Sequence, residues 1–132
     1  GDVAEAAANA THGAGVDVVI DLVGGAYLGA NIALLRPRGR LVIVGLVAGR
    51  EATLDMGMVL SRRLHIVGTA MRTRSVEEKA DVARFFTEHA LDLFDRGLLA
   101  PVIDAVMPIA EVASAHERME RNENVGKIVL AW

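Results

Sequence analysis

The sequence predicts an α/β fold containing the last three strands of an incomplete, doubly wound parallel sheet. Three observations predict it: apolar runs occur at near-regular spacing, each run ends in glycine or small residues, and helical or turn sequence separates them. The runs are Val16–Val23, Arg40–Gly45 and Leu64–Ala70. Because such runs lack strict alternation, we expect these strands to be buried on both faces, as parallel strands usually are.

The first third of the chain predicts two helices around the first strand. Asp2–Thr11 is rich in alanine and begins with acidic residues, which favours a helix. Apolar residues recur on one face of Tyr27–Leu35, which predicts a short second helix. Pro37-Arg38-Gly39 should end this helix before the second strand begins.

The middle of the chain predicts a loop and two more helices. We expect a loop over Leu46–Thr53 and a short helix near Met56–Ser61. After the third strand, Ser75 and Glu78 have the spacing of a capping box, which predicts a helix start. Gly97 is the expected end of the helical segment that follows.

The last thirty residues predict a strand, a helix and a strand. Val102–Met107 is strand-like, and Lys127–Leu130 is expected to form a short final strand. Between them we expect a helix that carries Val112, Ala113 and Met119 inward.

Composition excludes several classes of function. The 132 residues are 52% apolar and 23% charged, which indicates a folded protein rather than a disordered one. The net charge of −3 predicts no nucleic-acid partner, and the absence of cysteine predicts neither disulfides nor thiolate metal sites. No apolar run approaches a membrane span, and the first residues lack the features of a signal peptide. We therefore expect a cytoplasmic protein without a membrane partner, whose sequence starts inside a longer chain.

Ligands of open α/β sheets bind beyond the carboxyl ends of the strands, and this rule selects four segments. They are Asp21–Gly25, Val44–Gly49, Val67–Arg72 and Asn122–Lys127. No Gly-x-Gly-x-x-Gly phosphate-binding motif occurs in the sequence.

Each of these segments also has a purely structural interpretation. Asp21 could contact a ribose, or it could bond to local amides in a turn. The glycines of Val44–Gly49 could admit a ligand to the backbone, or serve a turn that needs positive φ. Arg72 and Arg74 could meet anionic groups or be solvated, and Asn122–Lys127 could simply stop a helix.

No catalytic side chain is predicted. The histidines are scattered and show neither the spacing of metal ligands nor a Ser/His/Asp arrangement; they are His12, His65, His89 and His116. We therefore assign no proton donor and no metal ligand.

Five short segments are each weak evidence when taken alone. Their order and their separations along the chain together form a specific pattern. The segments are Gly15–Gly25, Leu35–Val42, Gly68–Ser75, Ala115–Glu120 and Asn122–Leu130. Together they resemble the medium-chain dehydrogenase/reductase superfamily over essentially the whole chain. The nearest branch is that of the zinc-independent, NADPH-dependent quinone oxidoreductases.

The resemblance implies a place for each part of the chain. The three strands would be the last three of a six-stranded, Rossmann-type coenzyme sheet. Residues 1–100 would be the C-terminal half of the NAD(P)-binding domain, and residues 101–132 would join the catalytic, GroES-like domain. The cofactor would be NADPH, with NADH as the alternative, and no zinc would bind in this segment. The cofactor-binding residues would be Val44, Gly45, Leu46, Val47, Val67, Gly68, Thr69, Ala70 and Asn122.

Three functions follow as hypotheses. In the first, the parent enzyme transfers hydride from NADPH to a quinone or conjugated carbonyl, this chain supplies the nicotinamide-side wall, and the isolated chain is inactive. In the second, the chain is a non-catalytic dimerisation or interaction module, a homodimer joined through Leu64–Ala70. The third is an enoyl reductase of the same superfamily.

Overall fold

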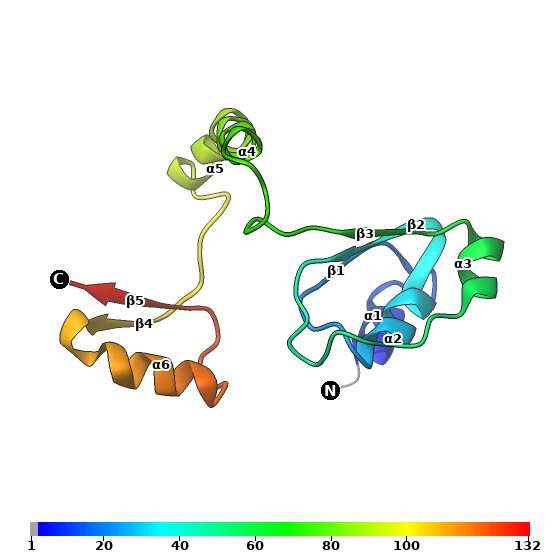
Figure 1. Cartoon of the computed structure of the whole chain (residues 1–132), viewed down its shortest axis with the longest axis horizontal. Coiled ribbons are helices and arrows are strands. Elements are labelled where there is room, and N and C mark those ends of the chain that lie inside the picture. The colour runs from blue at the N-terminus through cyan, green and yellow to red at the C-terminus, as the bar shows by residue number, and fades with distance from the viewer. Residues whose placement is uncertain (1–2) are drawn as a thin grey trace. The chain divides into compact units, whose positions relative to one another are not determined.

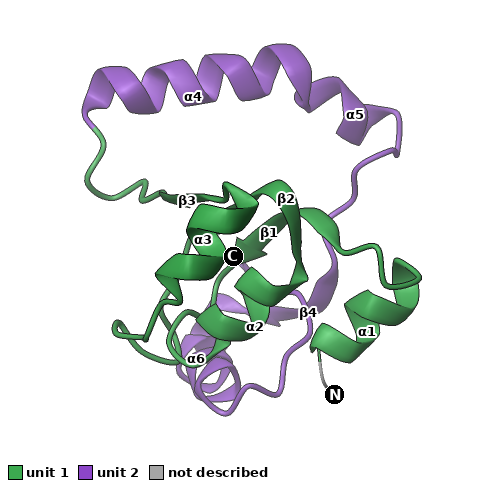
Figure 2. Cartoon of the chain, turned by 90° about the vertical axis from the view of Figure 1, so that its right-hand side faces the viewer, with its two compact units in different colours: residues 1–74 green, residues 75–132 purple. Residues whose placement is uncertain are grey.

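The computed structural model describes residues 3–132, which fall into two compact units, residues 1–74 and residues 75–132 (Figure 2). The predicted domain boundary lies after residue 100, whereas the boundary between these two units lies after residue 74. The boundary after residue 100 stays a prediction. None of the helices in the described part of the chain has the length and apolar character needed to cross a bilayer.

Unit 1 is a parallel sheet with helices (Figure 1). Within residues 3–74 the sheet has the strand order β1-β2-β3, and both strand pairs are parallel. This confirms the predicted parallel sheet. The elements are α1 (Val3–Ala10), β1 (Val16–Asp21), α2 (Tyr27–Leu34), β2 (Leu35–Ile43), α3 (Met56–Arg62) and β3 (His65–Gly68).

The core of unit 1 lies on one face of this sheet. Ile32 of α2 and Leu35 and Leu41 of β2 are its fully buried residues. Half-buried side chains from the three strands, from α2 and α3 and from the adjoining loops pack around them: Val16, Val19, Leu28, Ile43, Leu54, Met58, Leu64 and Ile66. Burial of these apolar groups is the main force that holds the helices on this face.

The opposite face of the sheet is apolar and open. Ile20 pairs with Val42, and Val42 pairs with Val67, so these three side chains form one row across the strands. Ile20 is 68% exposed and Val67 is 44% exposed. The expectation that the strands are buried on both faces is therefore wrong for unit 1. The helices of this unit supply apolar cover on one side only.

The second strand begins earlier than predicted. Pro37-Arg38-Gly39 does not separate the helix from the strand but lies inside β2. The pairing register with β1 shifts at this point, between Val16 and Val18, and Arg38 has a φ of 69°. A strand can pass through proline where its ladder is irregular, because the missing N–H is not needed there.

The other strand ends are shorter than predicted. The first strand stops at Asp21 rather than Val23, and the third spans His65–Gly68 rather than Leu64–Ala70. Asp21 closes a turn with its own side chain, and Arg63, just before β3, adopts a left-handed φ of 54°. These local turns terminate pairing before the apolar sequence runs out.

Unit 2 contains a helical segment and a small parallel β-α-β element. Its elements are α4 (Val76–His89), α5 (Leu91–Asp95), β4 (Ile103–Pro108), a 3-10 turn η1 (Ile109–Glu111), α6 (Val112–Glu120) and β5 (Lys127–Ala131). β4 pairs with β5 in parallel, and an ion pair of 2.8 Å joins Arg118 of α6 to Asp104 of β4. The predicted capping box is present at the start of α4, and Gly97 has the positive φ expected of a helix end.

Candidate functional site

A pocket lies at the carboxyl ends of β2 and β3. Its volume is about 440 Å³, and all of its lining residues belong to unit 1. They are Ile43, Val44, Gly45, Leu46, Gly68, Thr69, Ala70 and Thr73. This is the edge of a parallel sheet at which ligands are expected to bind.

Backbone hydrogen bonds fix the walls of this pocket. Ile43 and Gly68 are paired in register, and the Thr69 N–H donates to the Ile43 carbonyl oxygen at 2.9 Å. The N–H groups of Val44 and Gly45 both donate to the Asp21 carbonyl oxygen, at 2.7 and 3.1 Å. The two walls are therefore held by the sheet itself, which limits their movement.

The two glycines of the pocket serve different purposes. A Cβ at Gly45 would lie 2.4 Å from the Leu22 carbonyl oxygen, so the fold requires glycine there. At Gly68 a Cβ would meet no heavy atom of the described residues within 4 Å, and its φ is not in the left-handed region. The fold does not require glycine at residue 68, and its missing side chain leaves the pocket open.

The structure brings together six of the nine predicted cofactor-binding residues. Val47 and Val67 do not line the pocket: Val47 is 88% exposed in the loop after β2, and Val67 lies on the open face of the sheet. The six that do line it are Val44, Gly45, Leu46, Gly68, Thr69 and Ala70.

Asn122 belongs to unit 2, where it ends a helix. Its φ is 54°, and its N–H donates to the Met119 carbonyl oxygen at 3.0 Å. This geometry matches the structural interpretation of the segment, in which Asn122 ends a helix. Next to it, a hydrogen bond from the Arg121 side chain lowers the pKa of Glu123. That Asn122 closes over a cofactor stays a prediction.

Sequence analysis missed two residues that line the pocket. Ile43 and Thr73 line the pocket. Arg74, noted in the sequence only as a cation for anionic groups, directs its Nη2 to the Thr69 hydroxyl oxygen at 3.4 Å. The first two could have been found by extending the strand-end rule by one residue or one turn.

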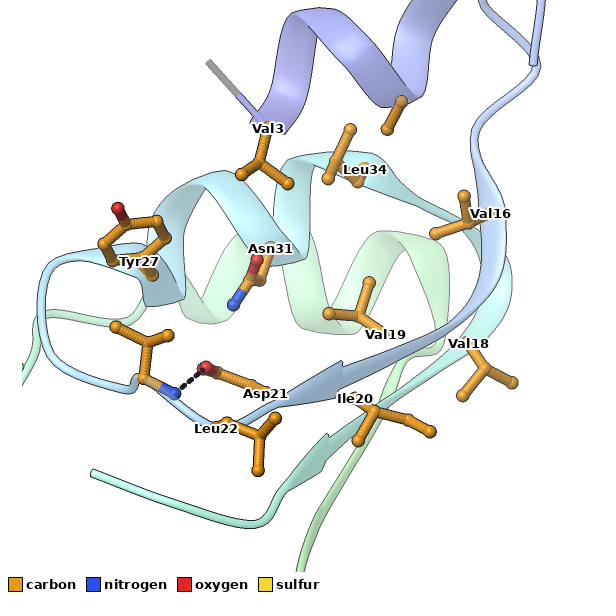
Figure 3. Close-up of a pocket in the computed structure, with 12 residues that line it drawn as sticks. Val3, Val16, Val18, Val19, Ile20, Asp21, Leu22, Tyr27, Asn31 and Leu34 are labelled. Atoms are coloured by element: carbon orange, nitrogen blue, oxygen red, sulfur yellow. Dashed lines mark hydrogen bonds between the residues drawn. The ribbon is translucent and has the colours of Figure 1, made fainter. Parts of the chain in front are cut away.

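Asp21 has the structural role that was the alternative to ribose binding. It is 4% exposed, and its Oδ1 accepts the N–H groups of Val23 and Gly24 at 2.8 and 2.9 Å. Figure 3 shows the first of these bonds beside an apolar cavity of about 340 Å³ around β1. Val3 of α1 and Tyr27 and Asn31 of α2 line the same cavity (Figure 3).

The described residues offer no metal centre. Among residues 3–132, no group of three or more His, Cys, Asp or Glu side chains is arranged to hold a metal ion. The pocket beyond β2 and β3 instead presents backbone, small apolar side chains and two threonine hydroxyls. Such a surface suits a small organic ligand that carries a few polar groups.

Comparison with known proteins gives consistent matches. The family model described as "Zinc-binding dehydrogenase" matches residues 1–130. The chain is 30% identical over 131 residues to the synaptic vesicle membrane protein VAT-1 homolog of Rattus norvegicus, covering 88% of this chain and 32% of that protein. It is 28% identical over 131 residues to quinone oxidoreductase-like protein 2 of Bos taurus, covering 99% and 37%.

A solved structure is similar to this chain in fold and in part of its sequence. An NAD-dependent alcohol dehydrogenase superposes with a TM-score of 0.76 at 30% identity, covering 99% of this chain and 35% of that one. The chain thus spans about a third of the length of the relatives it matches. The zinc in the family description has no fitting donor set among residues 3–132. Since the family model covers nearly the whole chain, this chain belongs to the zinc-binding dehydrogenases of the medium-chain dehydrogenase/reductase superfamily.

Proposed function

We propose that this chain forms the nicotinamide-side wall of the cofactor site in an NAD(P)H-dependent oxidoreductase. The parent enzyme would reduce a quinone or another conjugated carbonyl. The cofactor would be NADPH, with NADH as the alternative. The isolated chain would be inactive, because its sequence contains no glycine-rich phosphate-binding motif.

One observation carries the proposal: Gly68 leaves open space in a pocket at the carboxyl ends of two parallel strands. The pocket of about 440 Å³ is within the size range of small-molecule sites. Its rigid backbone walls can orient a planar ring, while Val44, Leu46 and Ala70 exclude water from one side of it. When bound, the cofactor supplies the hydride.

The relatives support this assignment of activity. The bovine relative is named as quinone oxidoreductase-like, and the superposed structure is named as an NAD-dependent alcohol dehydrogenase. Both names refer to dehydrogenase or oxidoreductase chemistry.

Calorimetric titration of the chain with NADPH, and in parallel with NADH, tests the proposal. Because the phosphate-binding motif is missing, we expect binding that is weaker than that of a complete cofactor site but measurable at millimolar cofactor. Gly68→Val should weaken binding at least tenfold, because the new side chain fills the pocket. Gly29→Val is the matched control, since Gly29 in α2 also has open space around a built Cβ but lies outside the pocket.

Two results would contradict the proposal. No heat at millimolar cofactor would mean that this chain does not form a cofactor wall by itself. Equal affinities for the wild type and Gly68→Val would mean that the cofactor binds elsewhere. Thermal unfolding of both variants confirms that they remain folded.

A second candidate function is that of an interaction module. It is favoured by the open apolar face of unit 1 and by the outer edges of β1 and β3, which no strand among residues 3–132 covers. We propose a homodimer joined through Leu64–Ala70, the segment that contains β3. This function is compatible with the first, since the pocket lies at the carboxyl end of β3, whereas a second chain would pair with the free side of that strand.

A further inference from the structure

The segment after β3 bends back so that a charged side chain reaches a hydroxyl of the pocket. The Arg74 N–H donates to the Met71 carbonyl oxygen at 3.3 Å, which closes a turn. Through this turn the Arg74 guanidinium reaches the Thr69 hydroxyl oxygen, with Nη2 and Oγ1 3.4 Å apart. Both residues are half-buried, and both belong to unit 1.

The chemistry of this pair fixes the role of the hydroxyl. A guanidinium has only donors, so in this contact the Thr69 oxygen must accept. The hydroxyl proton must then point to another acceptor. Among the residues that the structure describes, none accepts a hydrogen bond from it, and Thr69 lines the pocket. The proton is therefore available to a ligand.

Several other donors of the same wall are already used. The N–H groups of Val44 and Gly45 donate to the Asp21 carbonyl oxygen, and the Thr69 N–H donates to that of Ile43. The side chains of Val44, Leu46 and Ala70 carry no donor. Of the donors that remain on this largely apolar wall, the Thr69 hydroxyl is the one that a charged side chain holds in place.

Holding Thr69 with Arg74 costs the fold some stability. The Nε of Arg74 is buried without a hydrogen-bond partner among residues 3–132. A buried donor without a partner costs stability, and such a group calls for an explanation beyond folding. A nearby positive charge polarises the hydroxyl and strengthens it as a donor.

We infer that Thr69, positioned by Arg74, donates a hydrogen bond to a carbonyl oxygen of the ligand in this pocket. The inference rests on the proposed cofactor function. The carbonyl is either the carboxamide of the nicotinamide ring or the conjugated carbonyl of the substrate. Arg74 is a positioning residue, because it acts through Thr69.

The test is a binding series on the full chain, followed by NMR of labelled threonine methyl groups in the wild type and of backbone amides in every variant. The probes are nicotinamide, pyridine as the ring without a carboxamide, and cyclohexenone as a conjugated carbonyl. Thr69→Val removes the hydroxyl and keeps the shape, whereas Thr69→Ser keeps the hydroxyl. Thr53→Val is the matched control, since Thr53 is an exposed threonine of the same unit that lies outside the pocket.

We expect Thr69→Val to weaken binding of one carbonyl probe by about tenfold, the loss of one hydrogen bond. Binding to Thr69→Ser and Thr53→Val should stay close to wild type, and pyridine binding should not change. Loss of nicotinamide binding identifies the cofactor carboxamide, and loss of cyclohexenone binding identifies the substrate carbonyl. Arg74→Met should release the Thr69 side chain, which three-bond couplings report as rotamer averaging without any ligand.

The outcomes separate this inference from the function on which it rests. Wild-type affinity in Thr69→Val overturns the inference, and if Gly68→Val still weakens cofactor binding, the pocket assignment survives. If no probe shifts the Thr69 methyl group and Gly68→Val has no effect, both fail. Unchanged couplings in Arg74→Met overturn the positioning role of Arg74.

Discussion

At the scale of single residues, Asp21 closes the end of β1 with both its carboxylate and its carbonyl. The carboxylate accepts the Val23 and Gly24 amides, and the carbonyl oxygen accepts the amides of Val44 and Gly45. The carboxylate bonds could be predicted from the sequence, because an aspartate followed by a glycine pair has few local alternatives. The bonds from Val44 and Gly45, which directly follow β2, depend on sheet pairing and could not be predicted.

Asp21→Ala should lower the free energy of unfolding of unit 1 by about 1–3 kcal/mol, because two amide groups lose their acceptor. Asp21→Asn keeps Oδ1 as an acceptor and should change the free energy by less than about 1 kcal/mol. Urea unfolding followed by amide signals of unit 1 measures both. Equal losses in the two variants would mean that the charge of Asp21, rather than its acceptor, stabilises the turn.

The Thr69–Arg74 contact shows what residue-level prediction lacks. Both residues stand in a segment that the sequence singles out, and Arg74 was considered as a cation. Their contact depends on a turn between Met71 and Arg74 that no sequence pattern specified. The sequence shows the residue types, but it does not show which group the guanidinium contacts.

At the scale of elements, local signals were predicted better than strand limits. The capping box of α4 lies within four consecutive residues: the Ser75 hydroxyl accepts from the Glu78 N–H at 3.2 Å, and the Glu78 carboxylate accepts from the Ser75 N–H at 2.8 Å. In contrast, β2 begins at Leu35 because pairing with β1 overrides the proline and glycine at 37–39. In such cases the pairing of strands in the folded protein outweighs the local preference of proline and glycine against strands.

Ser75→Ala should destabilise the first turn of α4 by about 1 kcal/mol, since a helix start loses its cap. Ser75→Asp keeps a capping acceptor and should remain close to wild type. Hydrogen exchange of the α4 amides reports the difference. Equal exchange in both variants would show that α4 does not depend on its cap.

At the scale of the whole molecule, the order of elements follows the sequence prediction in both units, but the cover of the sheet does not. Apolar residues on both faces predicted burial on both faces, yet within unit 1 the row Ile20–Val42–Val67 carries no helix. Sequence pattern reports which faces are apolar. It cannot report which other element, or which other chain, covers them.

The proposed homodimer can be tested with two substitutions in the same row of that face. Val67 lies on β3 and Ile20 lies on β1, at opposite edges of the sheet. If β3 joins the subunits, Val67→Lys should weaken self-association at least tenfold, while Ile20→Lys should leave it unchanged. Sedimentation velocity across micromolar concentrations measures both. A wild-type chain that stays monomeric, or a dimer lost only in Ile20→Lys, contradicts the proposed interface.

The open face of unit 1 also has a consequence for temperature. Exposed apolar side chains such as Ile20, Leu22 and Val67 order the water around them, and covering them releases that water. Near room temperature such burial is driven by entropy and is accompanied by a fall in heat capacity. Any association through this face should therefore loosen on cooling, so that the chain is less assembled in the cold than at 25 °C.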